Sequence, residues 1–124
     1  MRVKRVKIGI KRFEEVLEGV KETMKKIERG EKVKERRGYY FENLEAFRRA
    51  LTEKRLEVLH VIKREKPSSV YELAKVLKRD VKNVTQDLEY LKQIGLVEIR
   101  RTKEKQERNI PEVKYDKIDL QIAV

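Results

Sequence analysis

The sequence predicts a mixed α+β fold, because its apolar residues follow two different periodicities in separate segments. Near the start, Val6, Ile8 and Ile10 alternate with polar or small neighbours, which is the period-two pattern of a β-strand. Between residues 13 and 94, apolar residues recur every three or four positions, as in amphipathic helices. Residues 118–124 alternate again, so a strand is expected there too.

The first predicted helix follows the N-terminal strand and ends at Gly30, a residue type that favours helix C-termini. We expect a dimerisation or packing role for this helix, because glutamates match most of its basic residues. The charged stretch 31–38 is expected to be a loop. The aromatic residues 39–41 belong to the core or an interface, with stacking on single-stranded nucleic acid as the alternative. The apolar stripe of the helix consists of Phe13, Val16, Leu17, Val20, Met24 and Ile27.

Four residues that favour helix N-caps divide the middle of the chain into shorter helices. Ser69, with Glu72 three positions later, matches the S-x-x-E capping box. Pro67 ends the helix before it, and Gly95 suits the position just after the last helix. The four caps are Asn43, Thr52, Ser69 and Asp80. The last two helices are expected to bury Leu73, Val76, Leu77, Val81, Val84, Leu88 and Leu91.

A strand is predicted directly after Gly95, beginning with Leu96–Ile99. Residues 100–108 contain no apolar side chain, so they are expected to form an exposed hairpin arm. Pro111 restricts the returning strand to an edge or a bulge. The basic residues of the arm are Arg100, Arg101, Lys103, Lys105 and Arg108, and its acidic residues are Glu104 and Glu107.

Composition narrows the classes of function. The chain has 124 residues, which fits one domain with an extension, and its formal net charge of +11 suggests an anionic partner. It has no Cys and one His, His60, and it lacks the glycine-rich loops that cradle phosphates. We therefore expect no enzyme, no catalytic or metal site and no cofactor. No secretory signal or membrane segment is expected, so the predicted location is the cytoplasm, and abundant Lys and Glu resemble thermophile composition.

Two short helices joined by a tight turn, then a strand and a basic hairpin, are the layout of a winged helix-turn-helix. The full fold prediction adds an N-terminal strand and helix and a C-terminal strand to that unit. We expect residues 81–94 to enter the DNA major groove as the recognition helix, with the wing, 100–108, on the backbone or minor groove. The predicted DNA-binding residues are Ser69, Tyr71, Lys82, Asn83, Thr85, Gln86, Arg100, Arg101, Lys103, Lys105 and Arg108.

Three segments also resemble MarR- and ArsR-like winged-helix transcriptional regulators: residues 69–77, 84–91 and 94–97. The chain also resembles a group of archaeal and bacterial predicted regulators, some of which are antitoxins. In that group a run like Leu-Thr-Glu-Lys-Arg-Leu-Glu, residues 51–57 here, precedes the helix-turn-helix, and a Tyr-Asp-x-Ile run, residues 115–118 here, follows the wing. The resemblance covers residues 41–124 and implies DNA binding as a dimer. The chain departs from many MarR proteins in lacking a long C-terminal dimerisation helix.

The predicted organisation is an N-terminal strand and helix over 1–40, serving dimerisation, and a DNA-binding domain over 41–124. The expected function is a transcriptional regulator that binds double-stranded DNA sequence-specifically as a homodimer, with no membrane partner. The alternative is an antitoxin or other protein-interaction module with a toxin protein as its partner, whose winged helix also autoregulates its operon. RNA binding is a third interpretation.

Overall fold

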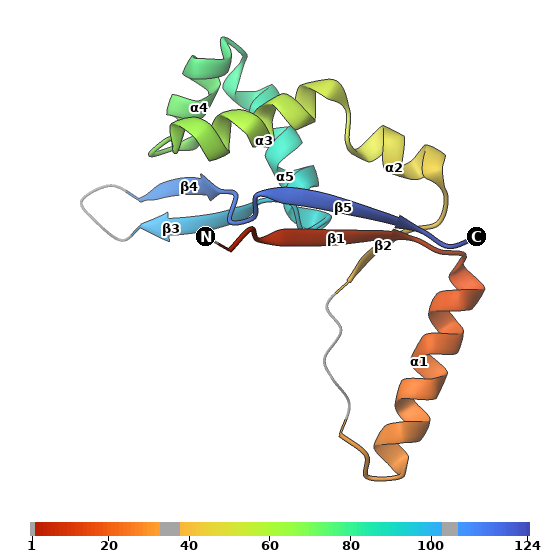
Figure 1. Ribbon diagram of the computed structural model, residues 1–124. Coiled ribbons are helices and arrows are strands. Elements are labelled where there is room, and N and C mark those ends of the chain that lie inside the picture. The colour runs from red at the N-terminus through yellow and green to blue at the C-terminus, as the bar shows by residue number, and fades with distance from the viewer. Residues whose placement is uncertain (1, 33–37, 103–106) are drawn as a thin grey trace.

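The computed structural model describes residues 2–32, 38–102 and 107–124. These residues form a mixed α+β fold in which several helices lie above two small sheets and the first helix extends below them (Figure 1). No helix in these ranges is long and apolar enough to cross a membrane. In chain order the elements are β1 (Arg5–Ile10), α1 (Phe13–Glu28), β2 (Tyr39–Phe41), α2 (Leu44–Ala50), α3 (Glu53–Glu65), α4 (Val70–Leu77), α5 (Val81–Gln93), β3 (Glu98–Thr102), β4 (Arg108–Glu112) and β5 (Lys117–Ile122).

The N-terminal strand is the centre of a three-stranded sheet whose order is β2-β1-β5. Both pairings are parallel, with Ile8 opposite Tyr39 on one side and Leu120 on the other. The second sheet is the antiparallel β3–β4 hairpin, in which Arg101 lies opposite Asn109. The first and last strands of the chain are therefore paired, which joins the predicted N-terminal segment to the end of the chain.

The hydrophobic core lies between α3, α4 and α5, together with β1 and the start of the hairpin. Two residues predicted to be buried are exposed, Val76 at 44% and Val81 at 38%, and a third, Leu77, is half-buried. In α4, Ala74 is buried in place of Val76. The face of α4 that packs on the core consists of Leu73 and Ala74. Val81 lies in the first turn of α5, at the edge of the core. The buried cluster contains Ile8, Val58, Leu59, Val61, Ile62, Leu73, Ala74, Val84, Leu88, Leu91, Leu96 and Val97.

All four predicted N-caps are confirmed. Asn43, Thr52, Ser69 and Asp80 accept hydrogen bonds from the backbone N–H groups of Ala46, Arg55, Glu72 and Lys82. In a capping box the Glu72 carboxylate would accept the backbone N–H of Ser69. Here the carboxylate reaches Ser68, one residue further back. It accepts from the backbone N–H of Ser68 at 3.0 Å and from the Ser68 hydroxyl, rather than from Ser69.

Strand β2 is absent from the sequence prediction, because three residues are too few to show a periodicity. Its first residue, Tyr39, packs over Gly95 at the end of α5. A Cβ at position 95 would lie 2.0 Å from the Tyr39 ring, and the backbone there has a φ of +78°. Gly95 is therefore required both by its left-handed conformation and by this close approach.

The Tyr-Asp pair at 115–116 connects the segment before β5 to distant parts of the chain. The Tyr115 hydroxyl donates to the Leu96 carbonyl at 2.8 Å, and burial raises the pKa of this phenol. The Asp116 carboxylate accepts from the Lys4 backbone N–H at 2.9 Å and lies 3.2 Å from the Lys63 ammonium. These contacts connect β1 and α3 to the loop before β5.

Acidification is expected to weaken the Asp116 contribution to stability. The Lys4 N–H and then Lys63 lower the pKa of this carboxyl in the folded state. Its contribution is therefore present above the unfolded pKa of about 3.9 and is lost as pH falls through the lower folded pKa. In urea unfolding, Asp116→Asn should be less stable than wild type at neutral pH, with the difference shrinking as pH falls below about 4. Lys63→Met leaves the hydrogen bond from the Lys4 N–H in place. The difference in stability between this variant and the wild type should therefore change less with pH than the difference seen for Asp116→Asn. Equal wild-type and Asp116→Asn stability at every pH would contradict this role.

Candidate functional site

Helices α4 and α5 meet at a tight turn that gives α5 a fixed orientation. Lys78 adopts the left-handed conformation, with a φ of 54°. The backbone N–H of Arg79 donates to the Ala74 carbonyl, so the last turn of α4 is closed without glycine. The inner face of α5 is held by Val84, Leu88 and Leu91, all of which are buried.

The opposite face of α5 is open to solvent near its N-terminus. Lys82, Asn83 and Gln86 are exposed, as predicted for residues that meet a partner. Thr85 is half-buried, and its hydroxyl donates to the Val81 carbonyl at 2.7 Å. Thr85 therefore presents to solvent mainly its oxygen lone pairs and methyl group, because its proton is already used.

Sequence reasoning missed a network of charged side chains that fixes α5 from its inner side. The Asp87 carboxylate lies 3.1 Å from Arg55 Nε and 2.8 Å from an Arg79 Nη atom, and all three side chains are less than a quarter exposed. Arg55 also donates to the carbonyls of Arg49 and Ala50 at the end of α2, and its guanidinium lies 4.2 Å from the centre of the Tyr90 ring. One carboxylate thus connects α3, the α4–α5 turn and α5. The sequence does contain one indication of this network. Asp87 is three residues after buried Val84 and four before buried Leu91, so it lies toward the inner face of α5, where a charge needs a partner.

The hairpin provides the second part of the candidate surface. Arg100 and Arg101 are exposed and project to opposite faces, since side chains alternate along a strand. Arg100 Nε lies 2.6 Å from the Glu112 carboxylate, so this charge is partly neutralised. No ion pair of Arg101 or Arg108 is found within the described ranges. The predicted contacts at Lys103 and Lys105 lie outside those ranges.

The start of α4 lies close to the hairpin. Hydrogen bonds from the Ser68 hydroxyl and backbone lower the pKa of the Glu72 carboxyl, and the charge of Arg108 acts in the same direction. Tyr71, in the first turn of α4, is 70% exposed, whereas Ser69 is half-buried and its Oγ accepts the Glu72 N–H. The first turn of α4, which contains Tyr71 and follows the Ser69 cap, therefore lies near β4 of the hairpin.

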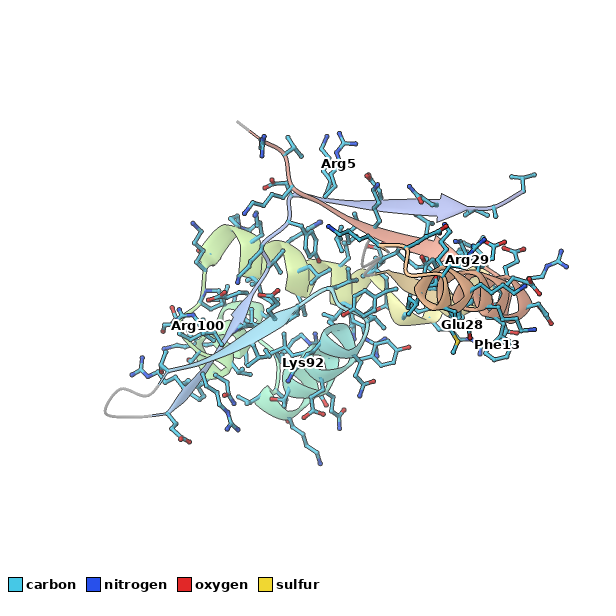
Figure 2. The ribbon with its side chains drawn as sticks, turned by 90° about the horizontal axis from the view of Figure 1, so that it is seen from below. Arg5, Phe13, Glu28, Arg29, Lys92 and Arg100 are labelled. Carbon is cyan, nitrogen blue, oxygen red and sulfur yellow. The ribbon has the colours of Figure 1, made fainter. Side chains whose placement is uncertain are left out.

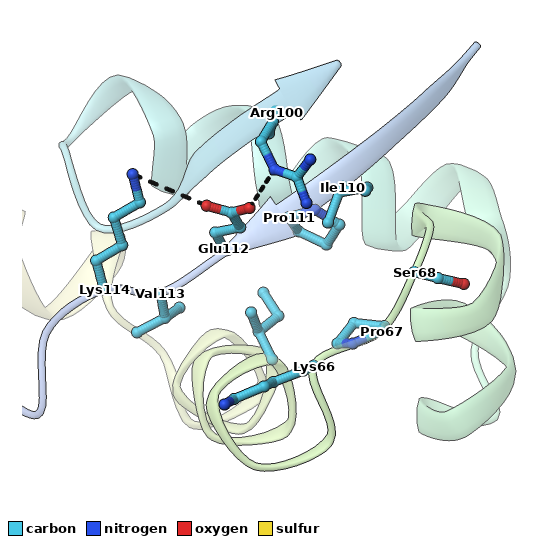
Figure 3. A pocket seen from close by; sticks show the side chains of 10 residues that line it. Lys66, Pro67, Ser68, Arg100, Ile110, Pro111, Glu112, Val113 and Lys114 are labelled. Atoms are coloured by element: carbon cyan, nitrogen blue, oxygen red, sulfur yellow. Dashed lines mark hydrogen bonds and ion pairs between the residues drawn. The ribbon is translucent and has the colours of Figure 1, made fainter. Parts of the chain in front are cut away.

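A hollow of about 440 Å³ lies between the α3–α4 connection and the hairpin (Figure 3). Its rim has Lys66 and Ser68 on one side and Arg100, Glu112 and Lys114 on the other. Glu112 faces both cations, at 2.6 Å from Arg100 and 3.9 Å from Lys114. Lys114 also lies 3.0 Å from the Glu98 carboxylate, so both cations on the hairpin side of the hollow have acidic partners. No grouping of three or more His, Cys, Asp or Glu side chains suited to a metal occurs among the described residues.

Together these features describe an α+β protein with a polar helix face and an exposed basic hairpin at one side of the molecule. In Figure 2, Arg100 on the hairpin lies at the opposite side of the view from α1, and Lys92 in the last turn of α5 lies between them. A family model named HVO_A0114 matches residues 50–120, and the chain belongs to this family. The matched region runs from the end of α2 into β5, so it contains the helices and hairpin described above. No curated protein and no solved structure matches the chain.

Proposed function

We propose that the chain is a transcriptional regulator that binds double-stranded DNA sequence-specifically as a homodimer. In this proposal, α3, α4, α5 and the hairpin act as a winged helix-turn-helix similar to those of MarR- and ArsR-like regulators. Strand β1, helix α1 and strand β5 are additions to that unit. Helix α5 enters the major groove, and the hairpin contacts the backbone or the minor groove.

The observation that carries the proposal is the exposed N-terminal half of α5. Lys82, Asn83 and Gln86 are exposed there, while Val84, Leu88 and Leu91 hold the other face in the core. Lysine suits guanine, and Asn and Gln suit adenine, when they reach base edges in the major groove. Arg101 and Arg108 on the hairpin, with Tyr71 on α4, supply exposed donors for neighbouring phosphates.

Two substitutions are expected to separate sequence reading from general affinity. Gln86→Ala should relax the base preference at one position of each half-site, at a cost of about 1–3 kcal/mol for the preferred sequence. Arg101→Ala should weaken binding to all sequences alike. The measurement is selection of bound sequences from a random duplex library, followed by titration of the best sequence and a scrambled one.

Glu22→Gln on α1 provides a matched control, because its side chain is remote from α5 and the hairpin. It should leave both affinity and preference unchanged. Failure to enrich any duplex sequence would exclude the proposal. An unchanged base preference in Gln86→Ala would exclude only the assigned base contact.

A further inference from the structure

Helix α1 carries an apolar stripe that no described residue covers. None of its residues is buried, and Phe13, Met24 and Ile27 are each about 60% exposed. In Figure 1 α1 projects away from the sheet, and in Figure 2 the Phe13 side chain points away from β5. An isolated helix of this length is only marginally stable in water, so packing of this stripe is needed to hold it.

Five of the six residues of the stripe are symmetric about Val20, and Leu17 alone has no apolar counterpart, since position 23 is Thr. Phe13 and Ile27 are each seven residues from Val20, and Val16 and Met24 are each four residues from it. When two such helices lie antiparallel with their Val20 residues in contact, Phe13 of each meets Ile27 of the other. A pattern that matches itself under a two-fold rotation is what an isologous interface requires.

The charged residues of α1 also favour antiparallel pairing of two copies. Residues 13–19 contain only acidic charges, whereas residues 21–29 are mainly basic. Antiparallel pairing places the acidic half of each helix on the basic half of the other, while parallel pairing places like charges together. The acidic half contains Glu14, Glu15 and Glu18, and the basic half contains Lys21, Lys25, Lys26 and Arg29 with Glu22 and Glu28.

We infer that α1 binds the α1 helix of a second copy of this chain, antiparallel, with the two-fold axis beside Val20. This inference builds on the homodimer of the proposed function and specifies how it forms. Helix α1 lies at the end of the molecule away from the hairpin (Figure 1), so pairing through α1 leaves the hairpin of both copies free. Dimerisation therefore uses the N-terminal helix in place of a C-terminal one.

The chain contains no cysteine, so single cysteines can report this geometry directly. Val20→Cys should form a disulfide-linked dimer under mild oxidation, because the two residues meet at the axis. Phe13→Cys alone should not, since its two copies lie about 21 Å apart along the helix axes. A mixture of Phe13→Cys and Ile27→Cys should cross-link. Cross-linking of Phe13→Cys and of Ile27→Cys with themselves would show parallel pairing and overturn the inference, as would no cross-linking at any of these positions.

Sedimentation gives an independent measurement without cross-linking. The wild type should sediment as a dimer, and Val20→Glu/Met24→Glu should sediment as a monomer whose core remains folded by near-ultraviolet circular dichroism. Glu22→Gln, on the opposite face of α1, should remain dimeric. A monomeric wild type, or a dimeric double variant, would overturn the inference. Because no DNA is present, these outcomes are separate from those that test DNA binding.

Discussion

Raising the salt concentration from about 50 to about 200 mM is expected to weaken DNA binding by roughly 10⁵-fold. If each subunit neutralises about five phosphates, the logarithm of the association constant falls with the logarithm of salt at a slope near −9 for the dimer. The predicted cationic contacts are Lys82 on α5 and the arginines and lysines of the hairpin arm. Fluorescence anisotropy with a labelled selected duplex at several salt concentrations measures the slope.

Hairpin arginines should contribute to this slope unequally. Arg101→Ala removes one phosphate contact from each subunit, so the slope should become shallower by about 2. Arg100→Ala should have a smaller effect, because Arg100 is already 2.6 Å from Glu112. Lys32→Ala removes an exposed charge beyond the end of α1, remote from the hairpin, and should leave the slope unchanged. A wild-type slope near zero would contradict phosphate contact, and equal effects of Arg101→Ala and Lys32→Ala would contradict its placement on the hairpin.

Replacing Asp87 with alanine is expected to lower the free energy of unfolding by about 3 kcal/mol, because two poorly exposed guanidiniums lose their counter-charge. The three side chains are only 15%, 22% and 24% exposed for Asp87, Arg55 and Arg79. Among the described residues, one Arg79 Nη atom is buried without a hydrogen-bond partner, and the other Nη donates to Asp87. Loss of Asp87 would leave both Nη atoms of this poorly exposed guanidinium without that acceptor. Urea unfolding followed by circular dichroism measures the change.

Asp119→Ala is the matched control, since its carboxylate meets Arg5 at 3.7 Å on the surface. It should cost no more than about 1 kcal/mol. Joint replacement by Arg55→Met, Arg79→Met and Asp87→Leu should recover part of the stability, because apolar residues can substitute for a buried ion network. A loss below about 1 kcal/mol in Asp87→Ala would contradict this role of the network.

Local signals in the sequence predicted most element boundaries. Asn43, Thr52, Ser69 and Asp80 each cap the helix expected of them, because a cap depends only on residues two or three positions away. The strand at each end of the chain was equally predictable from alternation. Side-chain burial in the short α4 was less predictable. Val76, which was expected to be buried, is exposed, and Ala74 is buried, since two helical turns do not define a face uniquely.

Long-range arrangements were beyond these local patterns. The order β2-β1-β5 joins residues more than a hundred positions apart, and nothing near Ile8 specifies Leu120 as its neighbour. In the candidate site, exposure of Lys82, Asn83 and Gln86 followed from the helical spacing of Val84 and Leu88. The Arg55–Asp87 pairing did not, because its partners come from two helices whose packing sets the distance.

The contact between Tyr39 and Gly95 has a consequence for how sequences of this kind can vary. Because the tyrosine ring occupies the space of a side chain at position 95, the two positions constrain each other across β2 and the end of α5. A sequence with alanine or a larger residue at 95 must have a smaller residue at 39 or a displaced β2. An alignment of homologues should therefore show paired substitutions at these two positions. The family match begins at residue 50, so such an alignment must extend beyond the matched region to include position 39.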